Sequence, residues 1–261
     1  MEPIYNKIGS GYNTTRQADP YITSRLLYFL KPVNGKKYLD AGCGSGNYTI
    51  ALAKHGLNFT GVEPSGEMLA IARNVDENVR WLQGTAEEMP LNDNVFDGAI
   101  ATLTIHHWID LTGGLKEINR VTITGGTLII FTATPEQMKG YWLNYYFPEM
   151  LAASISKMPS FDSIENALII AGFAIKTTEK YFIKNDLQDH FLYSGKHSPE
   201  IYLDEKMRKG ISSFAVLANP DEIKPGLSQL RADIESGEFL AVKEKFDNDQ
   251  GDYLFIVAQK E

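Results

Sequence analysis

Three glycines at alternate positions form the segment of this sequence with the clearest chemical potential. They are Gly42, Gly44 and Gly46 in YLDAGCGSGNYT, and Asp40 stands two residues before the first of them. Glycine allows positive φ angles and lets a ligand approach the main chain closely. A glycine-rich turn between an apolar strand and a helix therefore predicts a nucleotide-binding loop, without choosing the nucleotide.

The residues around this loop narrow the choice. The dinucleotide fingerprint G-x-G-x-x-G/A would place its third small residue at position 47, which is Asn in this sequence. A carboxylate at Asp40 would face a pyrophosphate unfavourably, whereas it suits a ligand that carries a cationic amine. Both residues disfavour a nicotinamide-dependent oxidoreductase, which stays as the weakest alternative.

Two adjacent histidines are candidates for acid–base or hydrogen-bonding chemistry. His106 and His107 follow the apolar segment FDGAIATL. Ligands of open parallel sheets bind beyond the carboxyl ends of the strands, and imidazole titrates near neutral pH. We therefore consider each histidine as a catalytic base, and a structural role in packing as the other interpretation. We predict no metal site, because adjacent histidines do not easily converge on one ion without other ligands.

Alternating strand and helix patterns must bring these residues together. Asp19 and Pro20 predict the start of a first helix, Pro32 its end, and Ser65 the start of the helix GEMLAIARN. Another helix is expected near LTGGLKEINRV. The strand-like segments are KKYLDA, NFTGVEP, VRWLQG, FDGAIATL, GTLIIFTA, AIKTTEKYFI and DYLFIVAQ. Strands joined by helices predict right-handed crossovers and a mostly parallel sheet with helices on both faces.

The segment before the last strand has helical signals that a bare doubly wound fold does not need. Ser198 and Pro199 indicate a helix start, and a later apolar stripe has helical spacing. We interpret this segment as an inserted helical cap. Aromatic residues after the fifth strand either pack between cap and sheet or line an apolar pocket: Tyr141, Trp142, Tyr145, Tyr146 and Phe147, with Phe191 and Tyr193 further on.

Five segments, taken in order over roughly residues 36–133, resemble the motifs of class I S-adenosylmethionine-dependent methyltransferases. They are LDAGCGSG, GVEPS, GTAEEMPL, FDGAIATLTIHHW and LKEINRVTITGGTLII. The sequence departs from the family at Thr85, where Asp is usual, and at Thr124, where Pro often precedes the two glycines. The resemblance implies an α/β, Rossmann-like, seven-stranded, mostly parallel sheet with an antiparallel last strand, helices on both faces and an inserted helical cap.

The same resemblance implies S-adenosylmethionine as cofactor, S-adenosylhomocysteine as product, and no metal. Glu63 would bind the ribose, because a carboxylate can accept two hydrogen bonds from a vicinal diol. Ala86 and Glu87 would lie at the adenine edge, and Tyr12 and Arg16 would contact the methionine carboxylate. The expected cofactor-binding residues are Tyr12, Arg16, Asp40, Gly42, Cys43, Gly44, Gly46, Glu63, Pro64, Met68, Thr85, Ala86, Glu87 and Thr102.

We expect three parts in the chain. Residues 1–34 would form N-terminal lid helices. Residues 35–135 would form the cofactor-binding core, completed by residues 160–183 and 251–261. The helical cap over the substrate site would comprise residues 136–159 and 184–250.

Composition restricts the partners. The net charge of −8 and the absence of a basic cluster longer than a Lys36-Lys37 dipeptide disfavour nucleic acid. Cys43 is the single cysteine, which we interpret as a small loop residue and not a nucleophile. A single cysteine fits a reducing, cytoplasmic setting, and no secretory signal or membrane-spanning run is recognised. We expect no membrane partner, and a monomer or homodimer.

The sequence therefore predicts a methyltransferase that moves a methyl group to oxygen, nitrogen or carbon of a small molecule by in-line displacement. A non-catalytic regulatory protein that binds the same cofactor is the main alternative. The acceptor and its methylated atom, the use of a general base, the oligomeric state and the pathway stay open.

Overall fold

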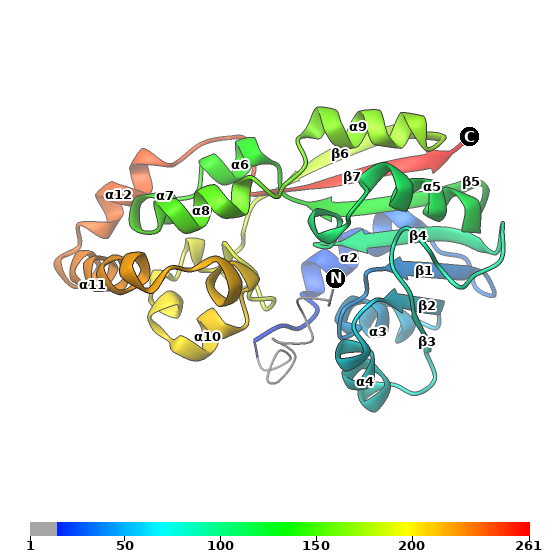
Figure 1. Ribbon diagram of the computed structural model, residues 1–261, viewed down its shortest axis with the longest axis horizontal. Coiled ribbons are helices and arrows are strands. Elements are labelled where there is room, and N and C mark those ends of the chain that lie inside the picture. The colour runs from blue at the N-terminus through cyan, green and yellow to red at the C-terminus, as the bar shows by residue number, and fades with distance from the viewer. Residues whose placement is uncertain (1–14) are drawn as a thin grey trace.

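The strands of residues 15–261, the part of the chain that the computed structural model describes, form one sheet (Figure 1). They are β1 Lys37–Ala41, β2 Asn58–Glu63, β3 Arg80–Gln83, β4 Phe96–Thr102, β5 Thr122–Thr132, β6 Phe173–Tyr181 and β7 Tyr253–Lys260. Their order is β3-β2-β1-β4-β5-β7-β6, and only β7 runs antiparallel to its neighbours. This confirms the predicted seven-stranded, mostly parallel sheet with an antiparallel last strand.

Helices cover both faces of the sheet, as predicted. The first face packs against α2 Pro20–Leu30, α3 Asn47–Ala53 and α4 Gly66–Val75. The second packs against α5 Leu111–Val121 and α9 Phe161–Ile170. Alternate residues of β5 serve the two faces: Ile129 and Phe131 are buried on the first, Leu128 and Ile130 on the second.

Local signals explain where the helices begin. The Asp19 carboxylate accepts a hydrogen bond from the backbone amide of Ile22 at 2.9 Å, and Pro20 opens α2. The Ser65 hydroxyl accepts one from the amide of Met68 at 3.3 Å at the start of α4. Both satisfy amides that have no partner inside the helix, so these predicted starts are confirmed.

The fifth strand begins earlier than expected. β5 starts at Thr122, which pairs with Phe96, and the pairing resumes between Gly98 and Thr127 after a bulge. Gly125, in this irregular stretch, has a φ of 79°. The glycines therefore form a kink within a longer strand, and the predicted start at residue 126 was too late.

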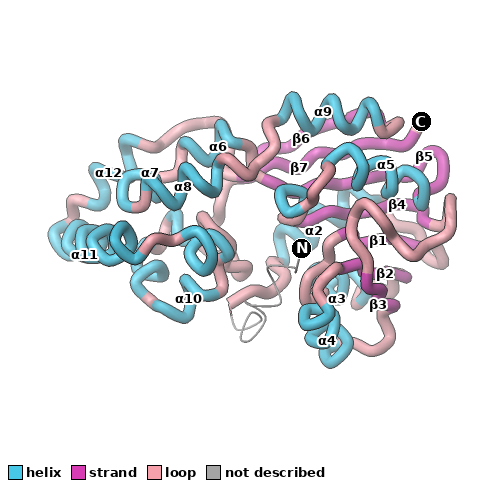
Figure 2. Tube along the Cα trace, in the orientation of Figure 1, coloured by secondary structure: helices cyan, strands magenta, loops and turns pink. Residues whose placement is uncertain are grey.

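A helical cap lies beyond one end of the sheet, as the fold class predicted, and two segments far apart in the sequence build it (Figures 1 and 2). The first segment contains α6 Pro135–Lys139, α7 Leu143–Tyr146 and α8 Pro148–Ile155. The second contains the 3₁₀ turns η3 Ser194–Lys196 and η4 Pro199–Leu203, α10 Glu205–Lys209, the wide π-helical turn η5 Ser213–Leu217, α11 Pro220–Ser236 and α12 Phe239–Lys245. Within residues 15–261, every helix is too short or too polar to cross a bilayer.

Aromatic rings form the core of the cap. Trp142 is fully buried, with Tyr146, Tyr202 and Phe239 edge-on to it. The rings of Tyr141 and Tyr193 stack with centroids 3.9 Å apart. The aromatic stretch after β5 therefore packs the two cap segments together. Of the two interpretations of this stretch, the structure favours packing over pocket lining.

Candidate functional site

The glycine loop joins β1 to α3 with three positive φ angles. Gly42, Gly44 and Gly46 have φ values of 77°, 55° and 79°. A Cβ atom on Gly42 would lie 2.0 Å from Thr104 Oγ1, and one on Gly46 would lie 2.4 Å from the Trp81 ring. A Cβ atom on Gly44 would meet nothing within 4 Å. Two of the glycines thus allow close packing, while the third exposes backbone to open space.

Glu63 holds this loop from the end of β2. Its Oε2 accepts a hydrogen bond from the Gly44 amide at 3.1 Å, and its Oε1 accepts one from the Ser65 amide at 3.0 Å. The side chain is buried, and burial raises the pKa of the carboxyl. Both oxygens are oriented by backbone and keep lone pairs for a further donor.

Asp40 and Thr102 each present a buried oxygen without a hydrogen-bond partner in residues 15–261. Asp40 Oδ2 accepts from the Thr49 hydroxyl at 2.6 Å, but Oδ1 has no such donor. Thr102 Oγ1 is likewise buried without a hydrogen-bond partner among the described residues. Burial raises the pKa of Asp40 to about 7. An unsatisfied buried acceptor is costly, so these atoms indicate that a polar ligand completes the site.

These atoms lie around a cavity of about 590 Å³, which we call the loop cavity. Its lining residues are Arg16, Asp40, Gly42, Cys43, Gly44, Ser45, Asn47, Tyr48, Glu63, Met68, Thr102, Leu103, Thr104, His107 and Asp189. The structure thus brings eight of the expected cofactor-binding residues together: Arg16, Asp40, Gly42, Cys43, Gly44, Glu63, Met68 and Thr102.

The other expected cofactor-binding residues that the structure describes do not line the loop cavity. Gly46 begins α3, the Pro64 carbonyl accepts from the Gln83 amide group, and the Thr85 hydroxyl accepts from the Glu88 amide. Ala86 is buried, and the Glu87 carboxylate accepts from the backbone amides of Ile109 and Asp110. Tyr12 lies outside the described residues. Cofactor contacts by these residues stay predictions.

Arg16 connects the loop cavity to the segment that leads into the cap. Its Nε donates to Asp189 Oδ1 at 2.5 Å and its Nη2 to Asp189 Oδ2 at 3.3 Å. Asp189 also accepts from the Tyr48 hydroxyl at 3.1 Å, and the Asn47 side chain donates to the Arg16 carbonyl. Arg16 is therefore at the cavity, as predicted, with an ion-pair partner that the sequence did not reveal.

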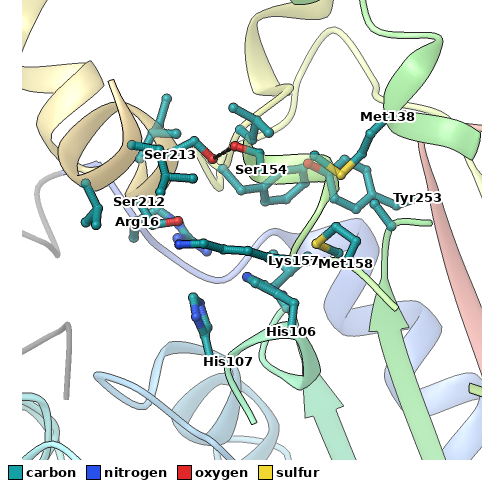
Figure 3. Close-up of a pocket in the computed structure, with 17 residues that line it drawn as sticks. Arg16, His106, His107, Met138, Ser154, Lys157, Met158, Ser212, Ser213 and Tyr253 are labelled. Atoms are coloured by element: carbon teal, nitrogen blue, oxygen red, sulfur yellow. Dashed lines mark hydrogen bonds between the residues drawn. The ribbon is translucent and has the colours of Figure 1, made fainter. Parts of the chain in front are cut away.

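A second cavity, of about 800 Å³, lies between the sheet and the cap, and we call it the cap cavity (Figure 3). Its lining residues are Arg16, Leu103, His106, His107, Ala133, Met138, Ser154, Lys157, Met158, Phe191, Leu192, Ile211, Ser212, Ser213, Val216, Leu217 and Tyr253. It shares Arg16, Leu103 and His107 with the loop cavity. The two cavities are therefore adjacent, and one imidazole borders both.

The histidines are in the neutral form at neutral pH. Their ring centroids are 3.9 Å apart in the 3₁₀ turn η2 Ile105–His107. Burial lowers the pKa of His106 well below its usual range and that of His107 to about 4. Nδ1 of His106 is buried without a hydrogen-bond partner in the described part of the chain. Neutral imidazole can accept a hydrogen bond or a proton, although a low pKa makes it a weak base.

Comparison with known proteins identifies the family to which this chain belongs. A family model described as "Methyltransferase domain" matches residues 39–130. The crystal structure of a putative methyltransferase from an antibiotic biosynthesis pathway of Anabaena variabilis is 33% identical in sequence, with a TM-score of 0.84. The alignment covers 94% of this chain and 99% of that one. The chain belongs to the class I S-adenosylmethionine-dependent methyltransferases.

Curated methyltransferases are similar to about half of this chain. An uncharacterized methyltransferase of Mycobacterium tuberculosis is 32% identical over 133 residues, which are 51% of this chain and 54% of that protein. The demethylmenaquinone methyltransferase of Chlorobaculum tepidum is 39% identical over 114 residues, or 42% of this chain and 47% of that protein. The chain thus spans about half the length of the curated relatives that it matches, so their acceptors do not transfer to it.

In this methyltransferase, Phe191 is an aromatic candidate from the sequence that does line the cap cavity, but other residues from the cap side were not predicted. Asp189, Lys157, Ser212 and Ser213 stand in segments without a recognisable motif. Tyr48 lies two residues after Gly46, and this closeness to the glycine loop could have indicated that it lines the loop cavity. No group of three or more His, Cys, Asp or Glu side chains suited to a metal ion is present in residues 15–261.

Proposed function

We propose that this methyltransferase transfers a methyl group from S-adenosylmethionine in the loop cavity to a small molecule in the cap cavity. One observation supports this most directly: the two cavities adjoin and share His107, Leu103 and Arg16. Methyl transfer needs donor and acceptor in neighbouring sites, and positioning alone can supply roughly 7 to 11 kcal/mol of the barrier.

The residues present fit the cofactor. Asp40, with its unpartnered Oδ1, would accept from the ammonium group of the methionine part, and Thr102 would hydrogen-bond nearby. Glu63 would accept from the ribose hydroxyls, since two amides already fix its oxygens. The open backbone at Gly44 leaves room for close approach. Arg16 would contact the methionine carboxylate, and Pro64, Thr85, Ala86 and Glu87 would lie toward the adenine.

When bound, S-adenosylmethionine would supply a sulfonium methyl group: a lone pair of the acceptor would bond to this carbon in line while the carbon–sulfur bond breaks and S-adenosylhomocysteine leaves. The protein holds the acceptor atom against that methyl group in a cavity partly closed to water. His106 and His107, both neutral, are placed to accept a hydrogen bond or the proton that the acceptor releases. Residues 136–159 and 184–250 act in this proposal as the cap. Of the expected lid, residues 1–34, the first 14 lie outside the described residues and α2 packs on the sheet.

Calorimetry with S-adenosylhomocysteine tests the cofactor part of the proposal. We expect binding by the wild type and at least about tenfold weaker binding by Glu63→Gln, because hydrogen bonds to a charged acceptor contribute about 1.5 to 3 kcal/mol. Glu165→Gln, a change at an exposed position on α9, is the matched control and should bind normally. Binding of NADH without binding of S-adenosylhomocysteine would instead favour the oxidoreductase alternative.

A methylation screen with a library of small molecules tests turnover. Formation of S-adenosylhomocysteine with any acceptor would exclude the non-catalytic regulatory protein. Tight cofactor binding without turnover of any library member would favour that alternative.

A further inference from the structure

The cap cavity has an unusual charge balance for this acidic chain. Among residues 15–261, the 17 that line it include no Asp or Glu, although the whole sequence carries a net charge of −8. The cationic residues in the lining are Arg16 and Lys157. The described part of the wall is therefore a local positive region in a negative molecule, and a cationic ligand would find no carboxylate among those lining residues.

The two cations differ in how they are compensated. Arg16 forms an ion pair with Asp189, whose side chain is buried. Lys157 follows α8, and its ammonium group forms no ion pair or hydrogen bond with any residue from 15 to 261. Its charge lies close enough to the histidines to help lower the pKa of both. Because those imidazoles are neutral and Arg16 is paired with Asp189, Lys157 is the cation of the lining without an ion-pair partner in residues 15–261.

Figure 3 shows how Lys157 lies in the cavity. Its side chain extends between the histidines and the opposite wall, where Ser212 and Ser213 come from the second cap segment. The hydroxyl groups of Ser154 and Ser213 hydrogen-bond each other at 2.8 Å across α8 and η5. Lys157 is an exposed residue, and its side chain lies beside the histidines where the cavity meets solvent.

The remaining wall is mostly apolar. It consists of Leu103, Ala133, Met138, Met158, Phe191, Leu192, Ile211, Val216 and Leu217. Val216 and Leu217 belong to the wide turn η5, and Val216 is 45% exposed although it lines the cavity. Methionines and an aromatic ring adapt to apolar ligands of varied shape. The cavity therefore matches a molecule with an apolar body and one acidic group.

We propose that the acceptor is an apolar molecule bearing an anionic group, such as a carboxylate or a phenolate, and that Lys157 pairs with this group. The proposal rests on the proposed function, because it takes the cap cavity as the acceptor site. The anionic oxygen is either the methylated atom or a handle that holds a neighbouring atom in place. In both cases an amine that is protonated at neutral pH is excluded.

Matched probe ligands test the charge preference in the presence of saturating S-adenosylhomocysteine. The first set is decanoate, decylamine and decanol, and the second is hydrocinnamate, phenylpropylamine and phenylpropanol. We expect calorimetry to show that at least one of the two acids binds at least about tenfold more tightly than its amine and its alcohol, as a charge-assisted hydrogen bond in an apolar site provides.

Variants at Lys157 test the residue. Lys157→Met should remove the preference for the acid, Lys157→Arg should retain it, and Lys157→Glu should reverse it toward the amine. Lys176→Met, at an exposed position on β6, is the matched control and should bind all probes as the wild type does. A thermal unfolding midpoint like that of the wild type shows that a variant is folded, and the reversal by Lys157→Glu cannot arise from misfolding.

Three results would each overturn the proposal: neither acid binds, the amines bind as tightly as the acids, or Lys157→Met leaves the acid affinity unchanged. Failure of the proposed function has a different signature, namely absence of S-adenosylhomocysteine binding while acid binding still depends on Lys157. For an acid that is turned over, mass spectrometry of the product separates the two forms of the proposal. An ester or ether shows that the anionic oxygen was methylated, and a product that remains an acid shows that it was the handle.

Discussion

At the scale of single residues, burial raises the pKa of Asp40 to about 7, and this shift has a definite sign for stability. The unfolded chain loses this proton near the ordinary pKa of 3.8, whereas the folded protein retains it up to about pH 7. Between these values the folded state binds more protons, so the contribution of Asp40 to stability falls as the pH rises.

We therefore expect Asp40→Asn to stabilise the cofactor-free protein at neutral pH while it weakens cofactor binding. The amide keeps a hydrogen-bonding group beside Thr49 but removes the buried charge. Thermal unfolding at several pH values should show a higher midpoint for the variant near neutral pH and a smaller difference near pH 4. Calorimetry should show at least about tenfold weaker binding of S-adenosylhomocysteine. A variant that is less stable at neutral pH and binds normally would contradict both expectations.

The low pKa of His106 leads to a second prediction, which concerns the pH dependence of activity. Because burial lowers the pKa of both histidines, with that of His107 at about 4, activity should show no inflection near pH 6.5. If His106 removes a proton from the acceptor, His106→Ala should lower kcat by about 100-fold, a typical contribution of general-base catalysis. The pH dependence of kcat is the measurement. An unchanged kcat and pH profile in His106→Ala would end the catalytic role and leave the packing role.

At the scale of elements, the segment before α2 is joined to the segment that enters the cap. The Thr15 carbonyl accepts from the His190 amide, Asp19 accepts from the Gln188 amide, and Arg16 pairs with Asp189. Sequence-distant backbone and side chains thus close over α3, the helix after the glycine loop. The buried Asp189 makes this junction sensitive to the loss of either charge.

Removing either partner of this ion pair should affect cofactor affinity differently. Arg16→Ala should weaken S-adenosylhomocysteine binding about tenfold, because it removes the cation that would face the carboxylate. Asp189→Ala should not weaken it, since the guanidinium is then released toward the ligand. Both changes should destabilise the free protein, by about 3 kcal/mol if the pair behaves as a buried one. Equal weakening by the two variants would show that Arg16 acts only through Asp189.

At the scale of the whole molecule, cofactor binding should stabilise the entire fold. A ligand that binds only the folded state at 100 times its Kd adds about 2.7 kcal/mol to the free energy of unfolding. We expect this gain with S-adenosylhomocysteine in denaturant titrations. NADH at the same concentration is the control and should give none. A gain with NADH alone would contradict the assignment of the loop cavity.

The sequence predicted those parts of the molecule that depend on neighbouring residues. Asp19 and Ser65 marked helix starts because a cap acts within three residues, and α5 has the bounds that its pattern indicated. Six of the predicted residues at the loop cavity lie in one turn or at the ends of adjacent strands: Asp40, Gly42, Cys43, Gly44, Glu63 and Thr102. Lys157 and Asp189 could not be found in this way, because the packing of cap segments far along the chain determines what they face.

The insertion points of the cap have a consequence for how this enzyme can change. One cap segment leaves after β5 and the other returns to β7, so both are anchored to strands on the opposite side of β4 from the strands β1 and β2 that flank the glycine loop. Lys157, Ser212, Ser213 and η5 line the cap cavity without lining the loop cavity. If the cap cavity binds the acceptor and the loop cavity binds the donor, as proposed, separate stretches of the gene encode the two specificities. Directed evolution confined to codons 154–158 and 211–217 should yield enzymes with new acceptors that still use the same methyl donor.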